Sequence, residues 1–174
     1  DTLRVSSKDT VIGIAAGGTT PYVLGGVEYA KTLGANTGLL TCTPIDQPSW
    51  CDVLIAIGTG AEVVTGSTRM KAGTATKMVL NMISTGAMVH AGKVYGNLMV
   101  DLRATNDKLR DRAARIISQV TGLERSDAFK LLDRADGRVK PALVMHAKSL
   151  TLEDAVMLID QHHGRLHPIL GDPK

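Results

Sequence analysis

A short apolar run, Val53 to Ile57, leads into a polar segment from Thr59 to Lys77, and a Met-rich apolar run follows. Strand, then a loop rich in Gly, Thr and Ser, then helix is how α/β proteins build an anion site. The N–H groups of such a loop and of the first helical turn face the ligand, and the helix dipole favours negative charge there. The segment therefore predicts an α/β fold with a ligand-binding loop after one strand.

Polar side chains in this segment are the candidate binding groups. Ser and Thr are also the usual helix-capping residues, so a cap explains any single hydroxyl equally well. The cluster as a whole, with several glycines and two cations, exceeds what a cap needs. The candidates are Glu62, Thr65, Ser67, Thr68, Arg69, Lys71 and Thr74.

A second loop of the same kind lies near the start of the sequence. The apolar, β-branched run Asp9 to Ala16 predicts a fully buried strand of a parallel sheet. Thr20 is a candidate N-cap and Pro21 suits the first position of the next helix. The loop residues between strand and helix are Gly17, Gly18, Thr19 and Thr20.

The helix after Pro21 has apolar residues at helical spacing and a stop at Gly34, and further strands are predicted at Thr37 to Cys42 and Val53 to Ile57. This order is a βαβ unit with parallel strands. Ligands of open α/β sheets lie at the carboxyl ends of strands, so we expect both loops to face one cleft.

The second half of the sequence predicts mostly helices. Met70 to Ala91 is apolar nearly all round, which favours a helix buried on both sides, as between subunits. Lys93 to Asp101 predicts a loop with a short helical turn. Asn106 opens an amphipathic helix that Gly122 ends.

Three shorter helices are predicted to follow, and they form a small bundle. One runs from Ser126, as its N-cap, to Gly137; one starts near Pro141; one runs from Thr151, with Asp154 at the capping-box position, to Gly164. We therefore assign residues 1–122 to an α/β domain and residues 123–174 to a helical domain.

Composition and charge argue against two classes of function, nucleic-acid binding and membrane association. A formal charge of +3 and an aromatic fraction of 3% make nucleic-acid binding a weak hypothesis. No run is long and apolar enough to span a bilayer, and no charged-then-apolar leader opens the sequence, so we expect no membrane partner and a cytoplasmic protein.

Neither the cysteines nor the tail histidines have the spacing of a metal site. Cys42 and Cys51 have no third or fourth partner, which favours reduced core thiols. His162, His163 and His167 straddle a helix stop, where a solvated helix end is the better interpretation. We expect no metal and no cofactor.

Several stretches resemble a known family. EVVTGSTRMKAGTATK at residues 62–77, KVYGNL at 93–98, DLRATN at 101–106 and DQHHG at 160–164 closely resemble the N-acetylmuramic acid 6-phosphate etherases. The vertebrate glucokinase regulatory protein is a more distant relative. The resemblance covers essentially the whole sequence.

This resemblance implies the sugar-isomerase (SIS) fold, a three-layer αβα arrangement around a parallel sheet that binds phosphosugars. It implies metal-independent cleavage of the D-lactyl ether of N-acetylmuramic acid 6-phosphate, to N-acetylglucosamine 6-phosphate and D-lactate. It also implies that Ala16 to Tyr22 is the phosphate loop. The family usually has Ser where this sequence has Gly17, and often Arg where it has Thr19, so binding would depend on backbone N–H groups, Thr19 and Thr20.

Family members are nearly twice as long in their α/β part. The portion without a counterpart here carries the opening strand, the first Gly-rich loop and both glutamates assigned the acid and base roles. We therefore expect the C-terminal portion of an etherase, as a fragment, a proteolysed product or a subunit of a split enzyme. We expect no catalytic residue in it, with Glu62 and Lys71 as supporting candidates.

Two alternatives need no acid and base pair. The first is a non-catalytic sugar-phosphate sensor of the glucokinase-regulator type, which needs the same loops. The second is a structural half that supplies dimer surface through the 70–91 helix. For the etherase we expect a phosphorylated amino sugar as ligand. We also expect a homodimer or pairing with the N-terminal portion, because the absent strand leaves a sheet edge open.

Overall fold

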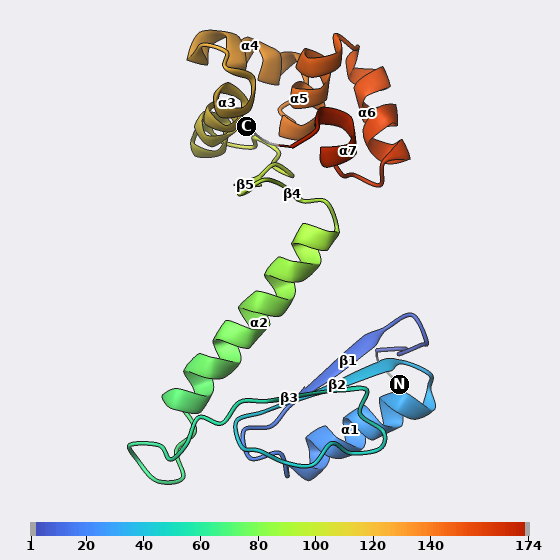
Figure 1. Cartoon of the computed structure of the whole chain (residues 1–174), viewed down its shortest axis with the longest axis vertical. Helices are drawn as coiled ribbons and strands as arrows, with labels where there is room; N and C mark the ends of the chain where they lie inside the picture. The colour runs from blue at the N-terminus through green and yellow to red at the C-terminus, as the bar shows by residue number, and fades with distance from the viewer. Residues whose placement is uncertain (1–2, 173–174) are drawn as a thin grey trace. The chain divides into compact units, whose positions relative to one another are not determined.

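The computed structural model describes residues 3–172, which form two compact units divided between Ile83 and Ser84 (Figure 1). The first is an α/β unit and the second a helical unit. The division lies inside helix α2 (Lys71–His90). The assignment of residues 1–122 to one family domain and 123–174 to another stays a prediction.

The α/β unit is built on a three-stranded parallel sheet. Its strands β1 (Thr10–Ile14), β2 (Asn36–Thr41) and β3 (Val53–Ala56) lie in the order β1-β2-β3. Helix α1 (Pro21–Thr32) connects β1 to β2 and packs against both. These elements confirm the predicted βαβ unit and agree with part of an SIS fold.

Helix α1 approaches β1 very closely at Gly13. A Cβ atom at this position would lie 2.6 Å from Cγ2 of Val27 and 2.7 Å from Cγ1 of Val23. Val27 and Leu39 are almost completely buried in the same contact. The strand therefore needs a residue without a side chain on the face that α1 covers.

The opposite face of the sheet is open at its two outer strands, so the prediction of a fully buried first strand is wrong. Side chains alternate between the two faces of a strand. Because Gly13 faces α1, Ile12 and Ile14 point away from it, and Ile14 is 42% exposed. Val53 of β3, which is paired with Gly38, is 57% exposed.

Helix α2 confirms the helix predicted at residues 70–91, but its predicted burial on both sides is wrong within this chain. Ala72 is the one buried residue of the helix. Met78 and Met82 are 53% and 63% exposed. The apolar pattern of α2 predicts that other residues pack against the helix, but the described residues leave most of its surface exposed.

The helical unit begins with a hairpin of β4 (Val94–Tyr95) and β5 (Leu98–Met99). This corrects the loop and helical turn predicted at residues 93–101. Gly96, at φ +58°, and Asn97 form the two-residue connection that antiparallel hairpins favour. That signal was present in the sequence.

Five helices follow and enclose one apolar core. They are α3 (Asp107–Thr121), α4 (Arg125–Arg134), α5 (Val139–Lys148), α6 (Leu152–Gln161) and α7 (His167–Leu170). The predicted bundle is confirmed, although the short α7 was missed. The large side chains that are almost completely buried in the core of the bundle include Ile117, Leu132, Leu143, Val144 and Leu166.

In the helical unit, two of the predicted helix starts are confirmed and one is wrong. The Asn106 side chain accepts a hydrogen bond from the Leu109 N–H at 2.9 Å, and Thr151 accepts one from the Asp154 N–H at 3.2 Å. Helix α4 has Glu124, not Ser126, at its N-cap. Ser126 is instead the second residue of the helix.

Asp52, just before β3, ties three elements of the α/β unit together. Its carboxylate accepts hydrogen bonds from the Thr37 N–H at 2.8 Å, the Thr37 hydroxyl at 3.0 Å and the Lys31 ammonium at 2.5 Å. The hydrogen bond from Lys31, followed by those from Thr37, lowers the pKa of Asp52 from 3.8 to about 2.

Replacing Asp52 with Asn should lower the melting temperature at neutral pH and leave it nearly unchanged near pH 2. A carboxyl group whose pKa is lowered by folding stabilises the fold above its unfolded pKa of 3.8, and that contribution is lost as the pH falls through about 2. Thermal unfolding of both proteins between pH 2 and pH 7, followed by circular dichroism, measures the difference. The exposed Asp46→Asn is the matched control, and a constant difference across the range would contradict the assignment.

Candidate functional site

The two predicted ligand loops leave the same edge of the sheet. Residues 15–20 follow β1 and residues 57–70 follow β3, and both strands are parallel to β2, which lies between them. With two strand spacings between them, the loops start about 10 Å apart. That span suits a sugar phosphate, and this edge is the usual ligand position in open α/β sheets.

The backbone of Cys42, at the end of β2, joins the two loops. Its N–H donates to the Ala16 carbonyl at 2.9 Å, and its carbonyl accepts from both the N–H and the hydroxyl of Thr59 at 3.3 Å. Its thiol lies 3.6 Å from the Ala72 carbonyl and from the Thr76 hydroxyl, in the first turns of α2. The cysteine is free and buried, but its structural role was not recognised in the sequence.

The loop after β1 is tightly turned and leaves backbone donors unused. Gly18 has φ +71°, donates its N–H to the Ala15 carbonyl at 2.9 Å, and has no room for a side chain beside Ile45. Within residues 3–172, the N–H groups of Gly17, Thr19 and Thr20 have no hydrogen-bond partner.

The Thr20 hydroxyl is also available to a ligand. Thr20 is the N-cap of α1, as predicted, but its side chain makes no capping hydrogen bond. Both Thr19 and Thr20 are exposed. Unused amide donors and two hydroxyls at the start of a helix make this loop the better anion site of the two.

At the start of α2, the chain's own carboxylate occupies the anion position. Glu62 accepts hydrogen bonds from the N–H groups of Lys71 at 3.1 Å and Ala72 at 3.0 Å. The bond from Ala72, then that from Lys71, lowers the pKa of Glu62 below its ordinary value of 4.5. The Lys71 ammonium donates to the Ala61 carbonyl at 2.8 Å.

These bonds define what Glu62 is suited to do. A general base works best with a pKa near the working pH, and the pKa of Glu62 is shifted the other way. Its carboxylate stays ionised at neutral pH and accepts hydrogen bonds from the first turn of α2, including one from the backbone of Lys71. This geometry suits an orienting group.

The remaining candidates lie on an exposed turn between Glu62 and α2. The turn is closed by the Ser67 N–H, which donates to the Val64 carbonyl at 3.0 Å, with Gly66 at φ +82°. In the described part of the chain, the side chains of Thr65, Thr68 and Arg69 have no hydrogen-bond or ion-pair partner. Among the described residues, no side-chain hydrogen bond joins this turn to the loop after β1.

Residues 3–172 contain neither a metal-ion cluster nor a membrane-spanning helix. No group of three His, Cys, Asp or Glu side chains within residues 3–172 is placed to hold a metal ion. No helix there is both long and apolar enough to cross a bilayer. His167, one of the tail histidines, lies 2.6 Å from an Asp172 carboxylate oxygen.

Comparison with known proteins identifies the relatives. No protein-family model matches the chain. Proteins named N-acetylmuramic acid 6-phosphate etherase from Crocosphaera subtropica, Synechococcus sp. and Yersinia pestis are 53%, 52% and 50% identical to it, over 96%, 95% and 97% of its length. The chain is a homologue of the C-terminal portion of these etherases.

The match covers 55%, 53% and 57% of those three proteins, so the chain spans about half the length of the curated relatives it matches. The resemblance inferred from the sequence motifs is confirmed. The segment EVVTGSTRMKAGTATK, on which part of that resemblance rested, forms the Glu62 turn and the first turns of α2.

Replacing Glu62 with Gln should loosen the start of α2. The amides of Lys71 and Ala72 would lose a charged acceptor, so their hydrogen exchange should accelerate and the melting temperature should fall. The loss should shrink as the pH falls below about 4.5, where the unfolded carboxyl group is protonated. Amide exchange measured by NMR tests this, with the exposed Glu28→Gln as control. Unchanged exchange at both amides would remove Glu62 from this role.

Proposed function

We propose that the chain is the phosphosugar-binding portion of an N-acetylmuramic acid 6-phosphate etherase. The observation that carries this proposal is 50–53% identity to proteins of that name over nearly the whole chain. Because these relatives are named as etherases, they favour the enzyme over the sensor alternative. The activity is cleavage of the D-lactyl ether to N-acetylglucosamine 6-phosphate and D-lactate.

The reaction is an elimination followed by addition of water. A base removes the proton next to the C1 aldehyde of the open-chain sugar, lactate leaves from C3 as its oxygen is protonated, and water then adds at C3. The steps need a base, an acid, and donors for the enolate-like charge. Arg69 and Lys71 are the donors we propose for this charge or for the lactyl carboxylate.

The acid and base come, in this proposal, from the portion of the etherase outside this chain. Glu62 is the one carboxylate on the loop after β3 up to Lys71, and its lowered pKa makes it a poor base. We assign it to orienting Lys71 or holding a sugar hydroxyl. No residue of this chain is proposed to act as the acid or the base.

The phosphate group is proposed to bind in the loop after β1. The unused N–H groups of Gly17, Thr19 and Thr20 and the free Thr20 hydroxyl supply its donors, and Gly18 gives the loop its turn. No cofactor or metal is proposed, because the elimination needs only acid, base and hydrogen-bond donors.

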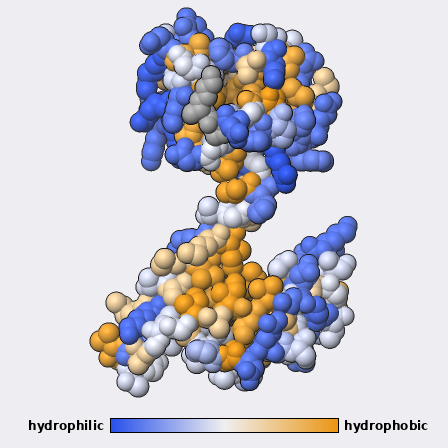
Figure 2. Space-filling model, in the orientation of Figure 1, coloured by the Kyte–Doolittle hydropathy of each residue, from blue (hydrophilic) through white to orange (hydrophobic). Residues whose placement is uncertain are grey.

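The open apolar surface supports pairing with the N-terminal portion. Figure 2 shows hydrophobic side chains gathered along α2 and the part of the α/β unit beside it. Met78 and Met82 of α2, and Ile14 and Val53 of the sheet, are exposed. Surfaces this apolar are normally covered. The relatives have nearly half of their length outside the match, which is enough chain to cover them.

The chain alone should release no D-lactate from N-acetylmuramic acid 6-phosphate, because we propose that the acid and base lie outside it. Co-expression with the unmatched N-terminal portion of the Crocosphaera subtropica relative should restore release and give a complex containing both. Lactate is measured by a coupled enzymatic assay and mass by light scattering. Release from the pure chain would refute the division of roles, and a dimer of the chain that excludes the N-terminal portion would refute the pairing.

Substitutions in the two loops should differ in whether their effect on sugar binding depends on the phosphate group of the sugar. Thr20→Ala should weaken binding of N-acetylmuramic acid 6-phosphate by about 1 kcal/mol, a small loss because the backbone donors of the loop remain. It should have little effect on binding of the unphosphorylated sugar, because we place the Thr20 hydroxyl at the phosphate. Lys71→Ala should cost about 1.5 kcal/mol with both sugars, since we place it near the lactyl end. Calorimetric titration of the chain with each sugar tests both. Equal losses on both sugars for Thr20→Ala would remove it from the phosphate loop.

A further inference from the structure

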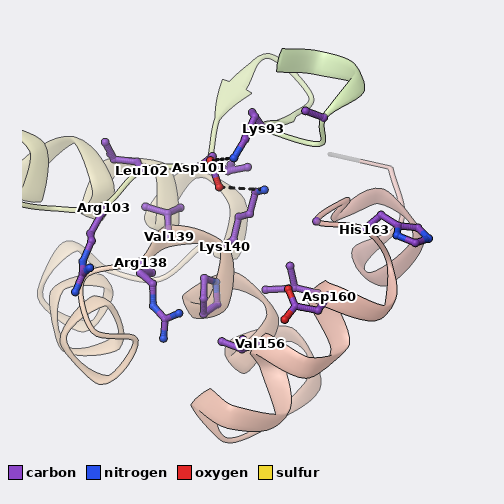
Figure 3. Close-up of a pocket in the computed structure, with 15 residues that line it drawn as sticks. Lys93, Asp101, Leu102, Arg103, Arg138, Val139, Lys140, Val156, Asp160 and His163 are labelled. Carbon is purple, nitrogen blue, oxygen red and sulfur yellow. Dashed lines mark hydrogen bonds and ion pairs between the residues drawn. The ribbon is translucent and has the colours of Figure 1, made fainter. Parts of the chain in front are cut away.

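The helical unit contains a cavity of about 480 Å³ that the proposed function does not use. It lies between the segment after β5, the start of α5 and the end of α6 (Figure 3). This volume is typical of small-molecule sites. Four cationic side chains and two carboxylates line it: Lys93, Arg103, Arg138 and Lys140, with Asp101 and Asp160.

The backbone sets the two arginines side by side. Arg103 and Arg138 are partners in an antiparallel bridge, flanked by hydrogen bonds from Ala104 N–H to Gly137 O at 2.9 Å and from Val139 N–H to Leu102 O at 3.3 Å. Directly opposed residues in such a bridge project to the same side. Each arginine neighbours a buried side chain, Leu102 or Val139, so the core fixes the orientation of the pair.

Most of the other charges in the cavity are already engaged. Asp101 accepts from the ammonium groups of both Lys93 and Lys140, the second at 3.2 Å, and Lys140 is 7% exposed. Burial raises the pKa of Asp101, but the two lysine hydrogen bonds outweigh it, so the carboxylate stays ionised. Arg103 pairs with Asp136 at 3.1 Å. The Asp101 cluster keeps one net positive charge.

Of the four cationic side chains that line the cavity, Arg138 is the one without an ion-pair partner among the described residues. Its Nε is shielded from solvent, and its side chain has no hydrogen-bond or ion-pair partner in residues 3–172. A shielded donor without an acceptor is rare in folded proteins and needs an explanation, and a bound acceptor supplies one. Figure 3 shows the Asp160 carboxylate directed toward the side of the cavity on which Arg138 lies.

We propose that this cavity binds the oxyanion, carboxylate or phosphate, of a sugar-sized molecule through the guanidinium of Arg138. A guanidinium binds either group through parallel N–H donors, and the Asp101 cluster, which also lines the cavity, adds its net positive charge. Asp160 opposes the anion, which limits affinity and favours ligands with hydrogen-bond donors at the other end. The proposal does not depend on etherase activity.

Titration of the whole chain with inorganic phosphate, followed by two-dimensional NMR, tests this site. The amides of Leu102 and Val139 report on the cavity separately from the loop after β1. Arg138→Gln should weaken binding at these amides about tenfold, the loss of one charge-assisted contact. Asp160→Asn, at an exposed position, should strengthen it several-fold. Arg112→Gln, on the exposed surface of α3, should leave it unchanged.

Titration with D-lactate then separates the two sources of the oxyanion. Tighter binding of lactate assigns a carboxylate, and tighter binding of phosphate assigns a phosphate group; either supports the site if Arg138→Gln weakens it. Equal losses for Arg138→Gln and Arg112→Gln would show only surface electrostatics and overturn the proposal. So would unshifted amides in the wild type, or an Asp160→Asn variant that is folded and binds no more tightly.

Discussion

The pairing of β2 with both of its neighbours is the constraint on which the α/β unit depends. Each parallel partner places its own loop at the carboxyl edge, and the backbone of Cys42, one residue past β2, bonds to both loops. Its thiol contacts the first turns of α2 as well. The end of β2 therefore contacts every element that we propose for sugar binding, through its backbone at the two loops and through the Cys42 thiol at α2.

The two helix starts at this edge solve the same electrostatic problem in different ways. Every helix begins with N–H groups that lack intrahelical partners, and an anion there is favourable. At α2 the chain supplies the anion itself, as the Glu62 carboxylate. At α1 neither the Thr20 side chain nor an acid in the first turn does so. Of these two helix starts, only that of α1 keeps unused donors for a ligand. We therefore place the phosphate at the start of α1.

Local signals in the sequence predicted the elements well, and missed what depends on distant contacts. Pro21, Gly34, Asn106 and Gly122 act within a few residues, and each bounds a helix as expected. The Gly96–Asn97 hairpin was missed although its signal is local. The Glu62 cap joins residues nine and ten positions apart, and the Arg103–Arg138 bridge joins residues farther apart still, so neither leaves a periodic pattern.

The failed burial predictions have a common physical cause. Hydrophobic periodicity reflects every surface that a helix or strand covers in the functional protein, whereas the exposed fraction counts only atoms of this chain. Met78 and Met82 of α2 and Ile14 of β1 satisfy the pattern of buried elements and are exposed in the chain by itself. The helical unit, which encloses its own core, shows no such discrepancy at Ile117 or Leu132. The failed burial predictions concern α2 and β1, which, in our proposal, the N-terminal portion of the etherase covers.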